Sequence, residues 1–156
     1  MNNPITIRSA TLSDLPTLLR FEQGIVRAER PLDPTLKPGE IHYYDLPSLI
    51  RSESTEVAVA CMDNKAIGSG FVEIREAQPY RLPAKFGYVG FMFVEPEFRG
   101  QGVSQSVLEH LIAWAQGHGI HEIRLEVYDT NGSAVRAYEK AGFEKSLVTM
   151  RLGLEN

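Results

Sequence analysis

The stretch that decides the fold is VEPEFRGQGVS, residues 94–104. Just before it, residues 86–94 are rich in aromatic and β-branched side chains and predict the most buried strand of the chain. After it, apolar residues recur at helical spacing from Gly102 to about His118, which is the strongest helix signal. A glycine-bearing turn at a helix start presents unpaired backbone N–H groups and the positive end of the helix dipole. The stretch therefore predicts an anion site.

The residue types in this turn favour a phosphate. Gly100 and Gly102 let the backbone approach an anion without a Cβ in the way, and Arg99 adds a charge-assisted donor. A tight strand-to-helix connection would explain the glycines but not the arginine. No Lys-Ser or Lys-Thr pair follows the second glycine, and no third glycine completes a dinucleotide fingerprint. Nucleoside triphosphates and nicotinamide cofactors are therefore disfavoured.

The rest of the chain predicts alternating strands and helices. Upstream, the predicted elements are a strand at 5–8, a helix from Thr11 that fades around Gly24, a proline-rich loop at 29–40, a short helix at 43–51, and a hairpin of strands 56–62 and 66–74 about the turn at 63–65. Downstream they are a strand at 123–127, a helix from Asn131 through Ala141 and a last strand at 143–152. Gly68 and Gly70 indicate an edge or a bulge. This order is an α/β layout with a mixed sheet, and 156 residues have the length of one domain, 1–156.

A second informative segment is NGSAVRAYEKAGF, residues 131–143. Asn131 can cap the helix, and Tyr138 lies seven residues later, about two helical turns, so both project toward the same side. A phenol with an ordinary pKa of about 10 is protonated at neutral pH, which suits an acid. An ordinary half-buried aromatic residue would fit the same position.

Together, residues 99–104 and 131–143 resemble two motifs of the GNAT superfamily of N-acetyltransferases, its coenzyme A pyrophosphate loop and its later Asn, Tyr and Ala-Gly-Phe motif. The family loop has Arg or Gln, two residues, Gly, one residue, then Gly or Ala. Ser104 departs from it at the last place. The resemblance is sharp over 87–143 and elsewhere lies in the order of elements. It implies a GNAT-type α/β fold whose mixed, mostly antiparallel central sheet is flanked by helices.

The resemblance also implies an activity and a set of site residues. An acceptor amine would attack the thioester of acetyl-CoA directly, through a tetrahedral oxyanion. Backbone N–H groups of the strand before the loop would stabilise that oxyanion, Asn131 would contact the pantetheine arm, and Tyr138 would protonate the departing thiolate. The implied donor-binding residues are Met92, Phe93, Val94, Arg99, Gly100, Gln101, Gly102, Val103, Ser104, Asn131, Ala134 and Tyr138.

The general base stays open between carboxylates. Glu126, on an otherwise apolar strand, and Glu95, just beyond the central strand, are the candidates, with Tyr88 as a third. A solvent-facing place in an alternating strand explains Glu126 equally well. The acceptor pocket is expected near His42, Tyr43, Tyr44 and Asp45, where a packed helix face would also explain the tyrosines.

Composition excludes several other functions. The net charge is −4 and the pI about 5.6, so no global positive field favours nucleic acid or anionic lipid. No apolar run is long enough to cross a bilayer and the first residues lack a signal-peptide pattern, so we expect a cytoplasmic protein. Cys61 predicts a quiet buried thiol. His110, His118 and His121 show no ligand spacing with a carboxylate, so we expect no metal.

Two readings from different classes follow. The first is an enzyme that acetylates a primary amine of a small molecule or a protein, with a longer acyl donor as a variant compatible with Phe91, Met92 and Phe93. The second is a sensor that holds acetyl-CoA without turnover. Arg75, Arg81 and Lys85 can meet an acidic acceptor or lie in a solvated loop. We also expect that the chain can pair as a homodimer.

Overall fold

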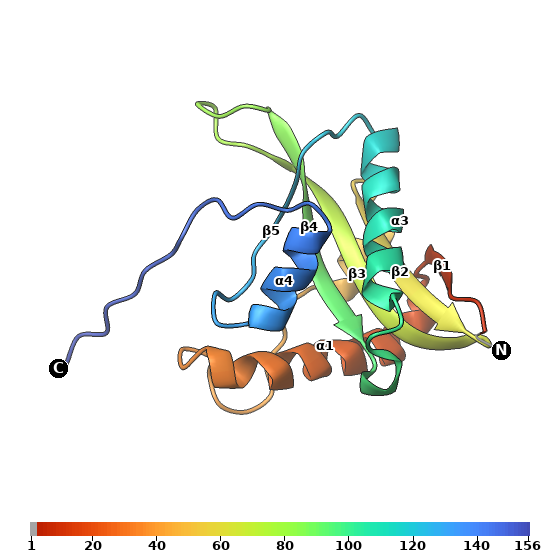
Figure 1. The fold of residues 1–156 in the computed structure, drawn as a ribbon, viewed down its shortest axis with the longest axis horizontal. Coiled ribbons are helices and arrows are strands. Elements are labelled where there is room, and N and C mark those ends of the chain that lie inside the picture. The colour runs from red at the N-terminus through yellow and green to blue at the C-terminus, as the bar shows by residue number, and fades with distance from the viewer. Residues whose placement is uncertain (1–2) are drawn as a thin grey trace. The chain divides into compact units, whose positions relative to one another are not determined.

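The computed structural model describes residues 3–156 in two units, one ending at Glu126 and one formed by residues 127–156. In the first unit, five strands form a sheet in the order β1-β2-β3-β4-β5 (Figure 1). The strands are β1 (Thr6–Ser9), β2 (Thr55–Met62), β3 (Lys65–Glu76), β4 (Lys85–Val94) and β5 (Ile123–Leu125). Neighbouring strands are antiparallel except β4 and β5, which are parallel. The mixed, mostly antiparallel sheet predicted from the sequence is confirmed.

Helices flank this sheet. They are α1 (Leu15–Glu29), α2 (Leu46–Arg51) and α3 (Val103–Gly117), with single 3₁₀ turns at Leu12–Asp14, Arg30–Leu32 and Pro96–Phe98. The predicted helix start at Thr11 is confirmed, because the chain turns there into the first 3₁₀ segment and then into α1. The carboxylate of Asp14 accepts a hydrogen bond from the Thr11 backbone N–H at 2.8 Å, which satisfies a donor at the helix start.

The two faces of the sheet carry side chains of different size. Large side chains on one face, including Val57, Val59, Phe71 and Phe91, form a buried cluster with residues of α1 and α2. On the opposite face, β2 and β3 carry small residues such as Ala60, Gly68 and Gly70, and a Cβ built on Gly70 would lie only 2.8 Å from a methyl of Val107 on α3. Because side chains alternate along a strand, the large and small residues sort onto opposite faces. Helix α3 can therefore approach the sheet closely.

The first helix is longer than predicted. It runs through Gly24, where the prediction let it fade, to Glu29. A Cβ at Gly24 would lie 2.5 Å from the ring of Phe93 on β4. The glycine is thus a point of close helix-to-strand approach, and tertiary packing overrides its low helix propensity.

Burial within the sheet also differs from the prediction. Strand β2 is buried along nearly its whole length, whereas β4 alternates buried and half-buried residues. Strand β3, which carries Gly68 and Gly70, is interior rather than an edge, and the register against β4 shifts between Ser69 and Phe71. The indicated bulge is therefore real, and the extra residue belongs to β4.

The second unit contains α4 (Gly132–Lys140) and no strand. Asn131 caps this helix as predicted, and Gly142, at φ +105°, ends it, with the Phe143 N–H donating to the Tyr138 carbonyl at 3.0 Å. The predicted last strand at 143–152 is wrong. Its apolar residues are exposed, Leu147 at 88% and Met150 at 90%. A strand needs a neighbour that completes its backbone hydrogen bonds, and residues 127–156 supply none.

Candidate functional site

The loop between β4 and α3 has the backbone geometry of an anion cradle. Gly100 and Gly102 lie in the left-handed region at φ +77° and +82°. A Cβ built on either glycine would meet nothing within 4 Å, so the surrounding space is open. Glycine adopts this conformation without the steric cost that other residues bear. The sequence-predicted pair is therefore required by backbone conformation, and it leaves the backbone accessible.

Helix α3 begins directly at this loop. Its N-cap residue is Gly102, which has no side chain to offer, and a helical hydrogen bond runs from the Ser106 N–H to the Gly102 carbonyl at 3.1 Å. The first N–H groups of a helix have no intrahelical partner. Those of Val103 and Ser104 therefore add donors to the positive end of the helix dipole. Val103 is buried at 2% exposure and fixes the helix start, whereas Ser104 is exposed.

Two polar side chains brace the loop. Arg99 is exposed, and its Nε donates to the Val94 carbonyl at 3.3 Å. Gln101 donates through Nε2 to the Glu97 carbonyl, also at 3.3 Å. One guanidinium donor thus anchors Arg99 to the end of β4. Because a guanidinium carries five N–H donors, the others can serve an anion.

Strand β4 opens on one side just before this loop. β5 pairs with it only at Gly87, Tyr88 and Val89 among the described residues. Beyond that point Phe91, at φ +59°, forms the bulge. The following residues, Met92, Phe93 and Val94, therefore carry backbone groups along an edge that β5 does not cover. An extended ligand with amide groups can pair with such an edge as an added strand does.

Glu95 lies at the corner where β4 becomes the loop. It is 8% exposed, and Arg20 of α1 donates through Nη1 to its Oε1 at 2.5 Å. Its backbone N–H donates to the Ile67 carbonyl at 2.8 Å. The geometry gives the carboxylate a structural contact between α1 and the strand end. Its role as a base stays a prediction.

Glu126 and Tyr88 lie close enough to influence one another. Glu126 is exposed just beyond β5, and Tyr88 is half-buried on β4. Burial raises the pKa of Tyr88, and the charge of Glu126 raises it further. A phenol with a raised pKa stays protonated at neutral pH, which disfavours Tyr88 as a base. Glu126 faces solvent, as the structural explanation of this residue expected. Its role as a base stays a prediction.

A buried carboxylate that sequence reasoning missed organises the expected acceptor region. Glu22 of α1 is 0% exposed and accepts hydrogen bonds from His42 Nδ1 at 2.7 Å and from the N–H groups of Tyr43 and Tyr44 at 2.9 and 3.0 Å. The hydrogen bond with Glu22 raises the pKa of His42. The available signal was the position of Glu22 one turn after Leu18, on the apolar stripe of the helix.

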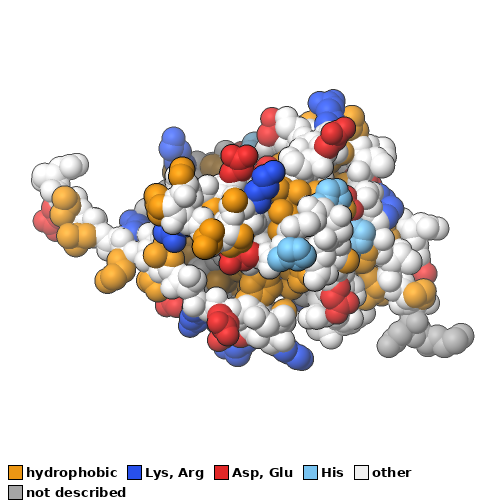
Figure 2. Space-filling view, turned by 90° about the horizontal axis from the view of Figure 1, so that it is seen from above, with side chains coloured by type: hydrophobic (Ala, Val, Ile, Leu, Met, Phe, Trp, Pro, Cys, Tyr) orange, Lys and Arg blue, Asp and Glu red, His pale blue; other side chains and the backbone are white. Residues whose placement is uncertain are grey.

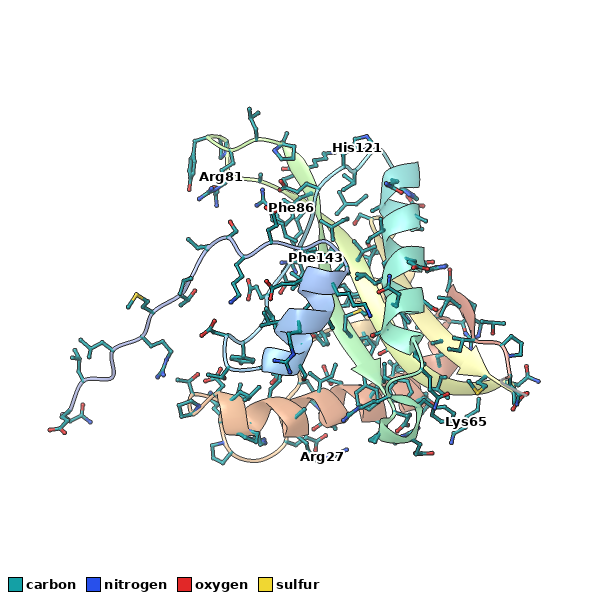
Figure 3. All side chains as sticks on the ribbon, in the orientation of Figure 1. Arg27, Lys65, Arg81, Phe86, His121 and Phe143 are labelled. Atoms are coloured by element: carbon teal, nitrogen blue, oxygen red, sulfur yellow. The ribbon has the colours of Figure 1, made fainter. Side chains whose placement is uncertain are left out.

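The predicted basic residues of the β3–β4 connection do not form one group. Arg75 donates to Glu73 at 2.7 Å and lies 3.8 Å from the ring centre of Tyr88. Arg81 lies at the far end of the connection, away from Phe86 at its base (Figure 3). Figure 2 shows acidic and basic side chains interspersed over the face it presents.

The remaining predicted residues belong to the second unit. Asn131 accepts the Ala134 N–H through Oδ1 at 3.3 Å, so its carbonyl oxygen serves the cap. Tyr138 is half-buried, and its ring contacts that of Phe143 edge-on at 5.8 Å. The Ala-Gly-Phe ending thus fixes the orientation of the tyrosine within this unit.

Within residues 3–156, no three His, Cys, Asp or Glu side chains are placed to hold a metal ion. His110 contacts Glu56 at 2.7 Å and His118 the Trp114 carbonyl at 2.8 Å. Cys61 is buried, as predicted. No helix in this part of the chain is long and apolar enough to cross a membrane.

Comparison with known proteins gives consistent results. The model of the acetyltransferase (GNAT) family matches residues 22–143. The chain is 26% identical to an aminoglycoside N(6')-acetyltransferase type 1 of Stenotrophomonas maltophilia, covering 96% of this chain and 94% of the relative. It is 28% identical to N-alpha-acetyltransferase 30 of Saccharomyces cerevisiae, covering 82% and 73%.

Solved structures share the fold. A mutant protein of Bacillus halodurans superposes with a TM-score of 0.86 at 22% identity, covering 96% of this chain and 99% of that one. A predicted acetyltransferase of Clostridium acetobutylicum, solved with acetyl-CoA, has a TM-score of 0.75 at 19% identity, with 96% of each chain covered. The chain therefore belongs to the acetyltransferase (GNAT) family and is an enzyme of the N-acetyltransferase class.

Proposed function

We propose that this enzyme transfers the acetyl group of acetyl-CoA to a primary amine of a small molecule or a protein. The observation that carries the proposal is the continuity of three features along the chain. A bulged strand with an uncovered edge is followed by a left-handed glycine loop and then by a helix start without a side-chain cap. Each feature suits a different part of one elongated donor.

The residues present fit that donor. Left-handed Gly100 and Gly102 leave room for a pyrophosphate, to which Arg99, Gln101, Val103 and Ser104 add backbone or side-chain donors. Bound acetyl-CoA supplies the activated acetyl thioester. The uncovered edge of β4, at Met92, Phe93 and Val94, is assigned to the pantetheine arm and to the developing charge on the acetyl oxygen.

Two residues of the second unit are assigned the roles that the family resemblance implies, Asn131 at the pantetheine arm and Tyr138 at the departing thiolate. Asn131 has its side-chain carbonyl in the cap, so its amide N–H₂ is the group proposed to contact the arm, near Ala134. Tyr138 is the proposed acid, because a phenol is protonated at neutral pH and can deliver its proton to a departing thiolate. Glu126 or Glu95 is proposed to take the proton of the acceptor amine, directly or through water.

The relatives give the range of acceptors to test. One is named for an aminoglycoside amine and one for a protein α-amine. A third, the bS18-alanine N-acetyltransferase of Escherichia coli, is 34% identical over 35% of this chain and 37% of its own length. We propose that the whole chain forms one catalytic domain that acts in the cytoplasm without a metal, and that it pairs as a homodimer.

The test is release of free thiol from acetyl-CoA across aminoglycosides, polyamines, amino acids and peptides. We expect release that depends on an acceptor and that falls about a hundredfold or more in Tyr138→Phe, the usual contribution of a general acid. Tyr80→Phe is the control, because that phenol is 79% exposed on the β3–β4 connection. Tight donor binding without turnover would favour the sensor reading, and faster release from a longer acyl-CoA would reassign the donor.

A further inference from the structure

The bulge in β4 takes one buried residue, Phe91, out of the paired register with β3. Phe91 is 1% exposed and has a positive φ, which few residues other than glycine adopt. At such a position the N–H and C=O groups turn away from their usual places in the ladder. A buried backbone group without a partner costs as much as a lost hydrogen bond.

Two side-chain hydroxyls supply the missing partners. The Phe91 N–H donates to the hydroxyl oxygen of Tyr44 at 3.3 Å, and the Phe91 carbonyl accepts from Ser69 Oγ at 3.1 Å. Ser69 comes from the neighbouring strand and is fully buried. Tyr44 comes from the segment before α2, far away in sequence. Its hydroxyl is therefore a contact between the acceptor region and the donor-binding strand.

Tyr44 is itself held from two directions. Its ring packs edge-on against Phe71 and Phe91, with ring centres 5.3 and 5.4 Å apart. Its backbone N–H donates to the buried carboxylate of Glu22 at 3.0 Å. Burial raises the pKa of the Tyr44 phenol, so the hydroxyl stays neutral and its oxygen can accept the Phe91 N–H. Helix α1, the segment before α2 and the bulge are thus joined by one chain of contacts.

We infer that Glu22 and Tyr44 are positioning residues for acetyl transfer, holding the Phe91 bulge so that the backbone donors on the uncovered edge of β4 face the thioester. This inference rests on the proposed function, because it assigns those donors to the acetyl-CoA arm. Neither residue needs to touch the donor. Their effect passes through the Phe91 peptide, whose N–H and C=O groups bind the hydroxyls of Tyr44 and Ser69.

The decisive variant is Tyr44→Phe, which removes only the hydroxyl and leaves the ring packing. Amide hydrogen exchange, followed by NMR on the whole chain without ligand, is expected to quicken about tenfold at Phe91, the equivalent of one lost hydrogen bond. The amides of core residues Val59 and Val72 are expected to keep their rates. A general loss of stability would instead quicken exchange at all three amides. Tyr43→Phe is the matched control for exchange, because the Tyr43 hydroxyl interacts with Glu29, whereas the Phe91 N–H donates to Tyr44.

The same variant is expected to weaken acetyl-CoA binding, measured by calorimetry without an acceptor, by about five- to tenfold. Tyr80→Phe is expected to leave that affinity unchanged. Glu22→Gln is expected to quicken exchange at Phe91 as well, and combining it with Tyr44→Phe should add little, because both act through one contact.

Unchanged exchange at Phe91 in Tyr44→Phe would overturn the inference, and so would faster exchange with unchanged donor affinity. If Tyr44→Phe does not fold, Glu22→Gln and Ser69→Ala are measured in the same way and decide the question. A wild-type chain that binds acetyl-CoA but acetylates no amine would refute the proposed function. The inference about Glu22 and Tyr44 would still be tested by amide exchange at Phe91 and by acetyl-CoA affinity, neither of which requires turnover.

Discussion

Replacing Gly100 by Ala separates the strain of the donor loop from its function, because the chain contains a matched position. Gly100 and Gly119 both lie at φ +77°, and a Cβ built on either would meet nothing within 4 Å. A non-glycine residue in the left-handed region costs about 1–2 kcal/mol. Gly100→Ala and Gly119→Ala should therefore lower the unfolding free energy by the same amount, a fall in Tm of about 2–8 °C for a chain of this size.

The two variants should differ in their affinity for acetyl-CoA. At Gly100 the added methyl enters the space where we place the pyrophosphate, next to the uncapped start of α3. Losing one or two backbone hydrogen bonds to an anion corresponds to about 10- to 100-fold in affinity. Gly119 follows the C-terminal end of the same helix and should leave affinity unchanged. Calorimetric titration with acetyl-CoA below both Tm values gives the comparison, and equal affinities in the two variants would refute the assignment of the loop.

Two further predictions concern pH. The hydrogen bonds from Arg8 lower the pKa of Asp14, so this carboxylate stabilises the fold above its unfolded pKa of about 3.9 and loses the effect as the pH falls through its lower folded pKa. Asp14→Asn should cost about 1 kcal/mol in urea unfolding at pH 7 and progressively less below about pH 4. The hydrogen bond to Glu22 raises the pKa of His42, so its contribution is complete below about pH 6.5 and is lost as the pH rises through the folded pKa. NMR titration should show this raised pKa, and Glu22→Gln should return it toward the ordinary value.

The conformation of the loop that we assign to the donor could be predicted because its determinants are local. A left-handed glycine, an N-cap and a helix start are properties of a few consecutive residues. Residues 99–104 therefore adopt the loop and helix start that the sequence predicted. The same holds for Asn131, whose side chain caps α4. Local chemistry alone fixes these conformations, whatever the rest of the chain does.

What could not be predicted depends on partners distant in sequence. Gly24 looked like a helix end, and only the ring of Phe93, packed where its Cβ would lie, explains why α1 continues. Glu22 was given no role from the sequence, because its hydrogen-bond donors lie in the segment before α2. The strand predicted at 143–152 would need a neighbouring strand to complete its hydrogen bonds, and the residues of that stretch cannot indicate whether one is present.

The bulge shows how these local and distant determinants act on one function. An extra residue in β4 redirects the backbone just past the point where β5 stops pairing. The uncovered strand edge and the glycine loop then follow one another along the chain, where a single elongated donor can contact both. An unsupported bulge would relax, because the positive φ of Phe91 and the rotation of its peptide groups out of the ladder both cost free energy. Support comes from Ser69 on the sheet and from Tyr44 beside the expected acceptor region. A substitution near the acceptor can therefore change donor affinity without touching the donor, and kinetic studies of acceptor specificity in this enzyme should measure both substrates.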